Sequence, residues 1–199
     1  GKDGASQMGL EDLAMFRTLL DGVVLYPADA LATEKVVELA AEHNGLTYIR
    51  TTREPTPILY KPEEDFVIGG SKTLKSSSQD QVTVIAAGIT LHEALTAYQT
   101  LQQEDIDIKV IDLYSVKPVD TKTLEKAAAE TQALVTVEDH FAEGGIGEAV
   151  TSALAHHPVP VYSLAVRKTP HSGTKDELLN YEQINSSAII TTVKQILKK

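Results

Sequence analysis

Two arginines follow a short apolar segment, at a position where their chemistry would suit a phosphate. Arg50 and Arg53 come directly after residues 46–49 (LTYI), which we expect to form a strand. Ligands of open α/β sheets gather just beyond the carboxyl ends of the strands, and an arginine can donate two parallel, charge-assisted hydrogen bonds to a phosphate. From position alone a surface salt bridge is the simpler interpretation, and spacing does not separate Arg50 from Arg53.

A second group of polar residues lies in the segment 138–147 (EDHFAEGGIG), between an expected strand and an expected helix. Glu138, Asp139 and His140 could together transfer protons or bind a metal. The glycines could admit a phosphate to the start of a helix, although their spacing is not the G-x-G-x-x-G of dinucleotide-binding proteins. We interpret the segment as a tight turn with a polar rim, and an interface role is the alternative.

The remaining polar candidates have simpler explanations than a site. Residues 1–7 (GKDGASQ) precede an expected helix and could bind an anion through backbone N–H groups, but a frayed terminus is the simpler interpretation. His156 and His157 end an expected helix, where a cation is favoured, and adjacent helical histidines point in different directions. No Ser–His–Asp set can be assembled by spacing, so spacing predicts neither a catalytic residue nor a metal ligand.

Composition excludes several classes of function. The 199 residues carry a formal net charge of −10, which argues against a surface for nucleic acid or for an anionic membrane. The sequence has no cysteine, so disulfides, thiolate metal sites and a cysteine nucleophile are excluded, and a reducing cytosol fits. No apolar run approaches the length of a membrane-spanning helix.

The first 60 residues alternate between helical and extended patterns. We expect helices over 9–20 and 31–43, the second capped by Asp29, and strands over 23–26 and 46–49. This is the rhythm of a parallel sheet, but two parallel strands cannot bury both of their faces. The piece therefore either joins the next sheet or lacks its partners.

Residues 61–80 contain proline, glycine and a serine run, which predict a linker. A regular alternation of strands and helices fills 81–199 and predicts an α/β fold, a three-layer α/β/α domain with a mostly parallel sheet. The expected strands are 82–87, 108–113, 133–137 and 159–166, and the expected helices are 91–101, 121–131, 147–156 and 186–197.

Five segments, in order and at compatible spacing, resemble the C-terminal third of transketolases, most closely the animal-type branch. They are GKDGASQMGLEDLAMFR (1–17), YPADALATEKVVELA (26–40), YIRTTR (48–53), VEDHFAEGGIGEAV (137–150) and AVRKTPHSGTKDELL (165–179). The resemblance implies that 1–60 is the end of the pyrimidine-binding domain, that 61–80 is the linker and that 81–199 is the transketolase C-terminal domain.

The resemblance also implies an activity. Transketolases move a two-carbon ketol group between sugar phosphates in the pentose phosphate pathway, with thiamine diphosphate and a divalent metal (Mg²⁺ or Ca²⁺), as cytoplasmic homodimers. Asp3 matches an acid that contacts substrate hydroxyls, Gln7 matches a residue beside the cofactor and substrate, and Arg53 matches the arginine that holds the substrate phosphate. The resemblance therefore chooses Arg53 over Arg50. The EPTP that follows Arg53 departs from the Pro-Glu-Asn of animal-type relatives.

No residue of this chain matches the family's catalytic glutamate, its aromatic clamp on the pyrimidine or its metal-binding segment. We therefore expect no catalytic residue, no metal ligand, no bound cofactor and no activity in this chain alone. One alternative is a related thiamine diphosphate enzyme, a deoxyxylulose-phosphate synthase or the β subunit of a 2-oxoacid dehydrogenase. Another is that the C-terminal domain is a non-catalytic dimerisation or regulatory module.

Overall fold

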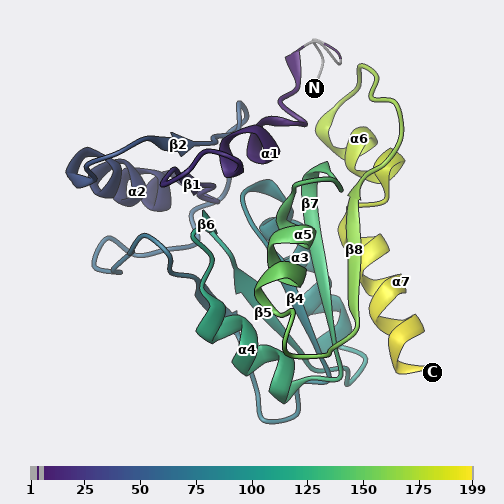
Figure 1. Ribbon diagram of the computed structural model, residues 1–199. Coiled ribbons are helices and arrows are strands. Elements are labelled where there is room, and N and C mark those ends of the chain that lie inside the picture. Colours follow the sequence, from purple (N-terminus) through teal and green to yellow (C-terminus); the bar gives the residue numbers. More distant parts are fainter. Residues whose placement is uncertain (1–3, 5–6, 199) are drawn as a thin grey trace.

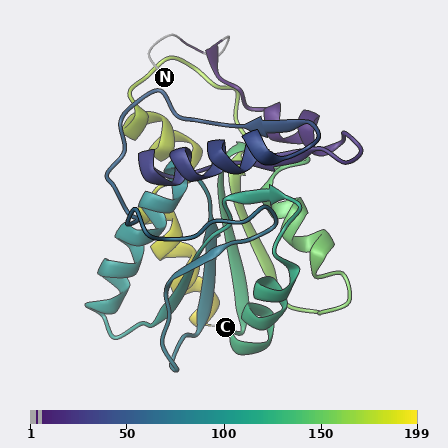
Figure 2. The same cartoon turned by 90° about the vertical axis from the view of Figure 1, so that its left-hand side faces the viewer.

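Two sheets organise the chain, and the smaller one lies across the carboxyl ends of the strands of the larger one (Figures 1 and 2). The computed structural model describes Gly4 and residues 7–198. Backbone hydrogen bonds join the two parts: Tyr26 N donates to Tyr114 O at 2.7 Å, and Phe141 N donates to Leu10 O at 3.0 Å. Because ligand sites of α/β proteins collect at such strand ends, this junction is where a site is expected.

The smaller sheet takes strands from both halves of the sequence. Its order is β2–β1–β6, with β1 parallel to β2 and antiparallel to β6. The two-strand piece of residues 1–60 therefore gains a third strand from beyond the linker. Asp29 caps α2, as expected, by accepting a hydrogen bond from Ala32 N at 2.7 Å. The elements of this part are α1 (Asp12–Arg17), β1 (Val23–Leu25), α2 (Ala30–Glu42), β2 (Thr47–Ile49) and β6 (Ser115–Lys117).

The larger sheet has the order β3–β5–β4–β7–β8, and only its edge pair β3–β5 is antiparallel. Every residue of β4 and β5 is buried, as expected for parallel strands between two helical layers. Strand β3 arises inside the expected linker, so this segment also supplies an edge strand. The strands are β3 (Lys72–Lys75), β4 (Val82–Ala86), β5 (Ile108–Asp112), β7 (Ala133–Phe141) and β8 (Val161–Val166).

Helices cover both faces of the larger sheet. One apolar core joins α3 and α7 to the sheet, and a second joins α4 and α5 to the opposite face. This arrangement confirms the three-layer α/β/α class with a mostly parallel sheet. Helix α6, which was not expected, lies near the junction with the smaller sheet. The helices are α3 (Ile89–Gln102), α4 (Thr121–Glu130), α5 (Ile146–Ala153), α6 (Lys175–Glu182) and α7 (Ser186–Leu197).

A fully buried carboxylate at the end of β5 holds the residue just before the linker, Tyr60, against the larger sheet. Tyr60 donates its hydroxyl to Asp112 Oδ2 at 2.5 Å, whereas Asp112 Oδ1 has no hydrogen-bond partner among the described residues. Burial raises the pKa of Asp112 to about 7, the hydrogen bond from Tyr60 opposes this rise, and the nearby Asp29 adds to it. Burying a charge with one partner is costly, so the folded chain favours the protonated form.

Asp112→Asn is expected to stabilise the fold at neutral and alkaline pH. Asp112 of the unfolded chain loses its proton near pH 4, whereas the folded chain keeps it to about pH 7. Between these values the folded state binds more protons, so the free energy of unfolding falls as pH rises. Asparagine removes this dependence and keeps an acceptor for Tyr60. Urea denaturation should show a gain of about 1–3 kcal/mol at pH 8 that shrinks toward pH 4; an equal gain at both pH values contradicts the argument.

Candidate ligand-binding site

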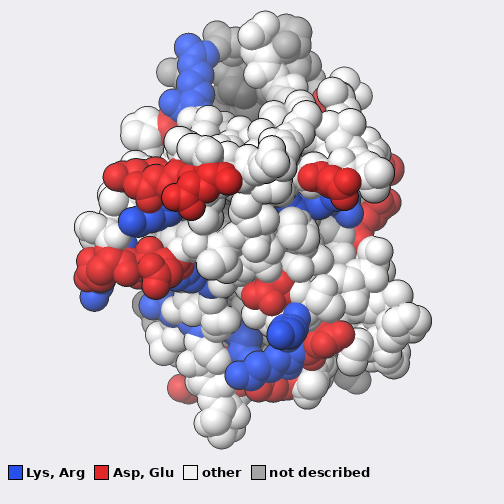
Figure 3. Space-filling view, turned by 60° about the vertical axis from the view of Figure 1, so that its left-hand side comes forward, with Lys and Arg blue, Asp and Glu red and all other residues white. Residues whose placement is uncertain are grey.

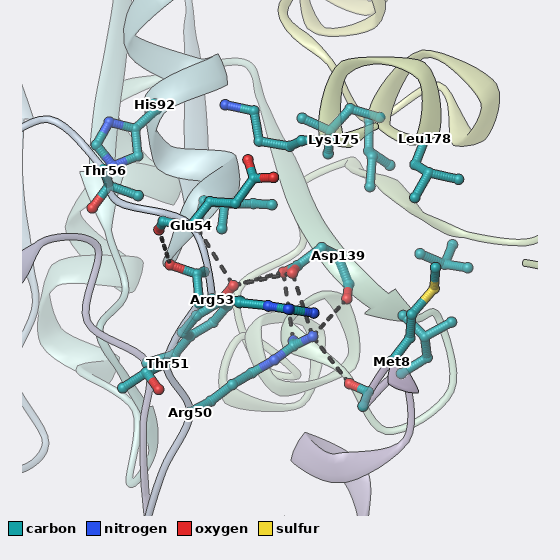
Figure 4. Close-up of a pocket in the computed structure, with 18 of the residues that line it drawn as sticks. Met8, Arg50, Thr51, Arg53, Glu54, Thr56, His92, Asp139, Lys175 and Leu178 are labelled. Carbon is teal, nitrogen blue, oxygen red and sulfur yellow. Dashed lines mark hydrogen bonds and ion pairs between the residues drawn. The ribbon is translucent and has the colours of Figure 1, made fainter. Parts of the chain in front are cut away.

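A cavity of about 860 Å³ opens at the junction of the two sheets. Its walls come from the segment before α1, the segment 50–57 that leaves β2, the start of α3 and helix α6. Figure 4 shows Arg50 and Arg53 extending from the 50–57 segment, with Lys175 and Leu178 of α6 across the cavity. The cavity thus lies where strands of both sheets end, as the ligand sites of open α/β sheets do.

Two of the three residues that the resemblance selects line this cavity. Arg53 is exposed and lies four residues beyond the end of β2, and Gln7 is exposed in the segment that leads to α1. Asp3, the third, lies outside the described residues. Gln7 and Arg53 therefore line the same cavity, although they are far apart in the sequence.

Arg50 has a different environment from Arg53. Its side chain is 11% exposed and forms ion pairs from Nε to Asp12 Oδ2 and from Nη2 to Asp139 Oδ2, both at 3.3 Å. Nη2 also donates to the carbonyl oxygens of Gly9 and Asp139, each at 3.0 Å. The guanidinium carbon lies 4.8 Å from the centre of the Tyr26 ring, within cation–π range. Arg50 is thus committed to protein groups, and its side chain is far less exposed than that of Arg53.

The charges around Arg50 hold it in its cationic form. Burial lowers the pKa of Arg50, but Asp139, Tyr26 and Asp12 together outweigh burial and raise it above its ordinary value. Burial and the nearby Asp139 raise the pKa of Tyr26 well above its ordinary range, so that its hydroxyl stays protonated. This hydroxyl donates to Asp139 at 3.0 Å. Burial and the hydrogen bond to Asp12 raise the pKa of Tyr48 to about 12.

The segment 138–147 forms the tight turn that we expected. Glu138 is buried, and its carboxylate accepts hydrogen bonds from Ile146 N at 2.5 Å and Gly147 N at 2.9 Å, at the start of α5. Burial raises the pKa of Glu138 to about 7, against the effect of these two N–H groups. A Cβ on Gly145 would lie 2.0 Å from Glu138 Oε2, so only glycine fits there. The protein's own carboxylate therefore occupies the helix start that a phosphate could have used.

The same turn is an interface within the chain. Arg17 of α1 donates to the carbonyl oxygens of Gly144 and Gly145. His140 is fully buried and its Nε2 accepts from Ala14 N at 3.2 Å, so its Nδ1 carries the proton and donates to Phe141 O at 2.6 Å. These contacts fix α1 on the carboxyl end of β7. They leave His140 no nitrogen for a metal or for proton transfer.

Sequence reasoning missed two basic residues of the cavity wall. Lys175 begins α6, and its side chain is 46% exposed. His92 of α3 has its Nε2 2.8 Å from Ala28 O, so this nitrogen donates to the carbonyl. A signal for Lys175 exists, because Thr174 and Glu177 have the T-x-x-E spacing of a capping box, and the structure contains that box.

Comparison with known proteins decides the family. The family model "Transketolase, C-terminal domain" matches residues 71–189, and "Transketolase, pyrimidine binding domain" matches residues 1–57. The chain belongs to the transketolase family. It is 50% identical to transketolase-like protein 2 of Mus musculus and 49% identical to transketolase of Homo sapiens, covering 100% of this chain and 32% of either relative. The chain thus spans about a third of the length of these relatives, which agree with the animal-type resemblance.

A solved structure supports the same assignment. A split gene transketolase, described as an inactive β4 tetramer, superposes with a TM-score of 0.89 at 34% identity, covering 97% of this chain and 62% of that one. Transketolase from Campylobacter jejuni superposes with a TM-score of 0.77 at 18% identity, which shows the shared fold.

The described residues fit only part of what a transketolase cofactor needs. The amide of Gln7 lines the cavity and can both donate and accept hydrogen bonds. Within Gly4 and residues 7–198, however, no group of three or more His, Asp or Glu side chains is placed to hold a metal ion. We therefore derive no step through thiamine diphosphate or its metal from this chain. In the same residues, no helix is long and apolar enough to cross a membrane.

Proposed function

We propose that this chain forms the sugar-phosphate-binding part of a transketolase that transfers a two-carbon ketol group in the pentose phosphate pathway. Arg53 holds the substrate phosphate, Asp3 contacts substrate hydroxyls and Gln7 lies beside thiamine diphosphate and substrate. One observation carries the proposal: Gln7 and Arg53, from separate segments, line one cavity at the carboxyl ends of the strands.

The charges on the cavity wall suit an anion. The chain has a net charge of −10, and acidic and basic side chains are interspersed on the face shown in Figure 3, so binding depends on local cations. Arg53 and Lys175 supply two of them. Among the acids of the lining, Asp139 pairs with Arg50, and Glu93 accepts a hydrogen bond from a backbone N–H at the start of α7, which partly neutralises their charge. The exposed Glu54, directly after Arg53, adds negative charge to the wall and opposes the binding of an anion.

The ligand-binding proposal predicts binding without turnover for the purified chain. Titration with ribose 5-phosphate, followed by ¹H–¹⁵N NMR, should shift the signals of Gln7, Arg53 and Lys175, and ribose should shift them much less. With thiamine diphosphate, Mg²⁺, xylulose 5-phosphate and ribose 5-phosphate, no product should form, because no residue of this chain matches the family's catalytic glutamate or its metal-binding segment. Shifts confined to other surfaces would overturn the binding role, and product formation would overturn the expectation of inactivity.

Three further features belong to the same proposal. We place the pyrimidine-binding part at 1–60, the linker at 61–80 and the C-terminal domain at 81–199. The match to the pyrimidine-binding model ends at residue 57, close to the first of these boundaries, and the match to the C-terminal model begins at residue 71.

We also propose a homodimer as the working assembly. The tetramer named for the solved split gene transketolase supports self-association of such chains but not this stoichiometry. A cytoplasmic location fits the absence of cysteine.

A further inference from the structure

The half-buried cluster around Arg50 joins the two segments that line the cavity. Arg50 lies three residues before Arg53, and it donates to the carbonyl oxygen of Gly9, two residues after Gln7. On its other side it is held by the side chain and carbonyl oxygen of Asp139. Asp139 belongs to β7, which comes from the other half of the chain.

We propose that Asp139 is a positioning residue for the sugar-phosphate site, acting through Arg50 to fix the segments that carry Gln7 and Arg53. This inference rests on the proposed function of the cavity. It assigns to the C-terminal domain a role in substrate binding although that domain supplies none of the three ligand residues.

The planar guanidinium of Arg50 contacts both segments at once. Its planar fork donates in several fixed directions, here to Asp139, to Asp12 and to Gly9 O. One rigid group therefore sets the distance between the segment before α1 and the segment after β2. A lysine could not do this, because its single ammonium carries no planar fork.

The Asp139 carboxylate is itself held in place by its neighbours. Tyr26 donates to both carboxylate oxygens, at 3.1 and 3.0 Å, and its ring lies beside the Arg50 guanidinium. Ile89 N, at the start of α3, lies 3.5 Å from the Tyr26 hydroxyl. Asp139 is thus held from the β1 side and from α3, so it is a fixed anchor for Arg50.

The energetics of buried ion pairs favour a positioning role over a purely stabilising one. Taking two charges out of water costs much of what their attraction returns, so such a pair adds little net stability. It does specify one arrangement, because any other leaves a buried charge without a partner. Because Arg50 is fixed in this way, the segment that carries Arg53 leaves β2 from a fixed position.

Three variants of the full chain test the inference. Asp139→Ala removes the anchor, Asp139→Asn keeps an acceptor without the charge, and Glu143→Gln is the matched control in the same turn because Glu143 is exposed. The readouts are the dissociation constants for ribose 5-phosphate and ribose by NMR, the Arg53 Nε–H signal, and hydrogen exchange of 7–12 and 49–57. Far-UV circular dichroism checks folding.

For Asp139→Ala we expect roughly tenfold weaker binding of ribose 5-phosphate. This corresponds to losing about 1.4 kcal/mol of binding free energy, which is comparable to the contribution of one hydrogen bond between a charged side chain and the phosphate. Binding of ribose, already weak, should change less. The Arg53 Nε–H signal should shift and broaden, and both segments should exchange faster. Asp139→Asn should recover part of each effect, and Glu143→Gln should match the parent chain. If Asp139→Ala does not fold, the same comparison is made with Asp139→Asn, for which a two- to fivefold loss is expected.

The outcomes separate this inference from the proposed function. If the parent chain does not bind ribose 5-phosphate, the proposed function fails, and the exchange data alone judge the positioning role. Unchanged exchange and an unchanged Arg53 signal in the Asp139 variants overturn the inference. Equal losses for ribose and ribose 5-phosphate, with faster exchange throughout the chain, also overturn it, because they indicate general destabilisation.

Discussion

Arg53→Ala should weaken binding of ribose 5-phosphate to this chain by about 10- to 100-fold. The side chain is exposed on the cavity wall, and the proposed contact is a charge-assisted hydrogen bond to phosphate. Such bonds contribute about 1.5–3 kcal/mol, and each 1.4 kcal/mol changes the dissociation constant tenfold. NMR titration or calorimetry of the purified chain measures the loss.

Two further variants show whether the loss belongs to the site. Arg167→Ala removes an exposed arginine that does not line the cavity, so its affinity should equal that of the parent chain. Arg53→Lys keeps the charge but loses the planar fork and should fall between the parent and Arg53→Ala. The phosphate role is contradicted if Arg53→Ala weakens ribose and ribose 5-phosphate by the same factor.

The layers of the fold could be predicted because the apolar pattern is strong where two helical layers cover a strand. β4 and β5 are continuous buried runs, and both were expected within one residue. The elements that were missed lack such a pattern. β3 is an edge strand of sequence KTLK, and β6 has three residues that pair only because β1 lies beside them. Their pairing depends on tertiary contacts that local pattern does not contain.

The roles of Arg50 and Arg53 show where sequence reasoning about the site ends. Both follow the same strand, and their types and positions favour neither for a ligand. The deciding partner, Asp139, is 89 residues from Arg50. Its location at the end of β7 was predictable, but its contact with β1 and β2 depends on how the smaller sheet lies on the larger one. The family resemblance supplied the choice of Arg53, and the structure adds that Arg50 is held by Asp12 and Asp139.

The turn 138–147 shows that residue types alone do not identify a ligand site. Its glycines and acids are the residue types of a phosphate or metal site, yet they satisfy one another. Glu138 occupies the start of α5, and His140 and the glycine carbonyls bind α1. Residues of the types that bind ligands elsewhere thus connect α1 to the end of β7 in this chain.

Gly88→Ala, at the start of α3, should cause a large loss of stability. Gly88 has φ +55°, and a Cβ there would lie 1.9 Å from the ring of Tyr26. That ring is fully buried and its hydroxyl binds Asp139, so it cannot turn aside without breaking the cluster. Overpacking costs about 1–3 kcal/mol and a strained backbone about 1–3 kcal/mol, so we expect a decrease of about 2–6 kcal/mol in the free energy of unfolding.

Urea denaturation of Gly88→Ala, beside Gly173→Ala, measures this decrease. A Cβ on Gly173 would lie 3.3 Å from the Leu178 side chain and 3.5 Å from Glu177 Oε2, and the φ of Gly173 is not in the left-handed region, so the control should lose less than about 1 kcal/mol. The clash also predicts non-additivity: combining Gly88→Ala with Tyr26→Ala should cost clearly less than the sum of the two single variants. Additive losses would place the cause in the backbone alone. A Gly88→Ala chain as stable as its control would mean that the Tyr26 ring moves freely, and the Asp139 anchor that depends on it would then be loose as well.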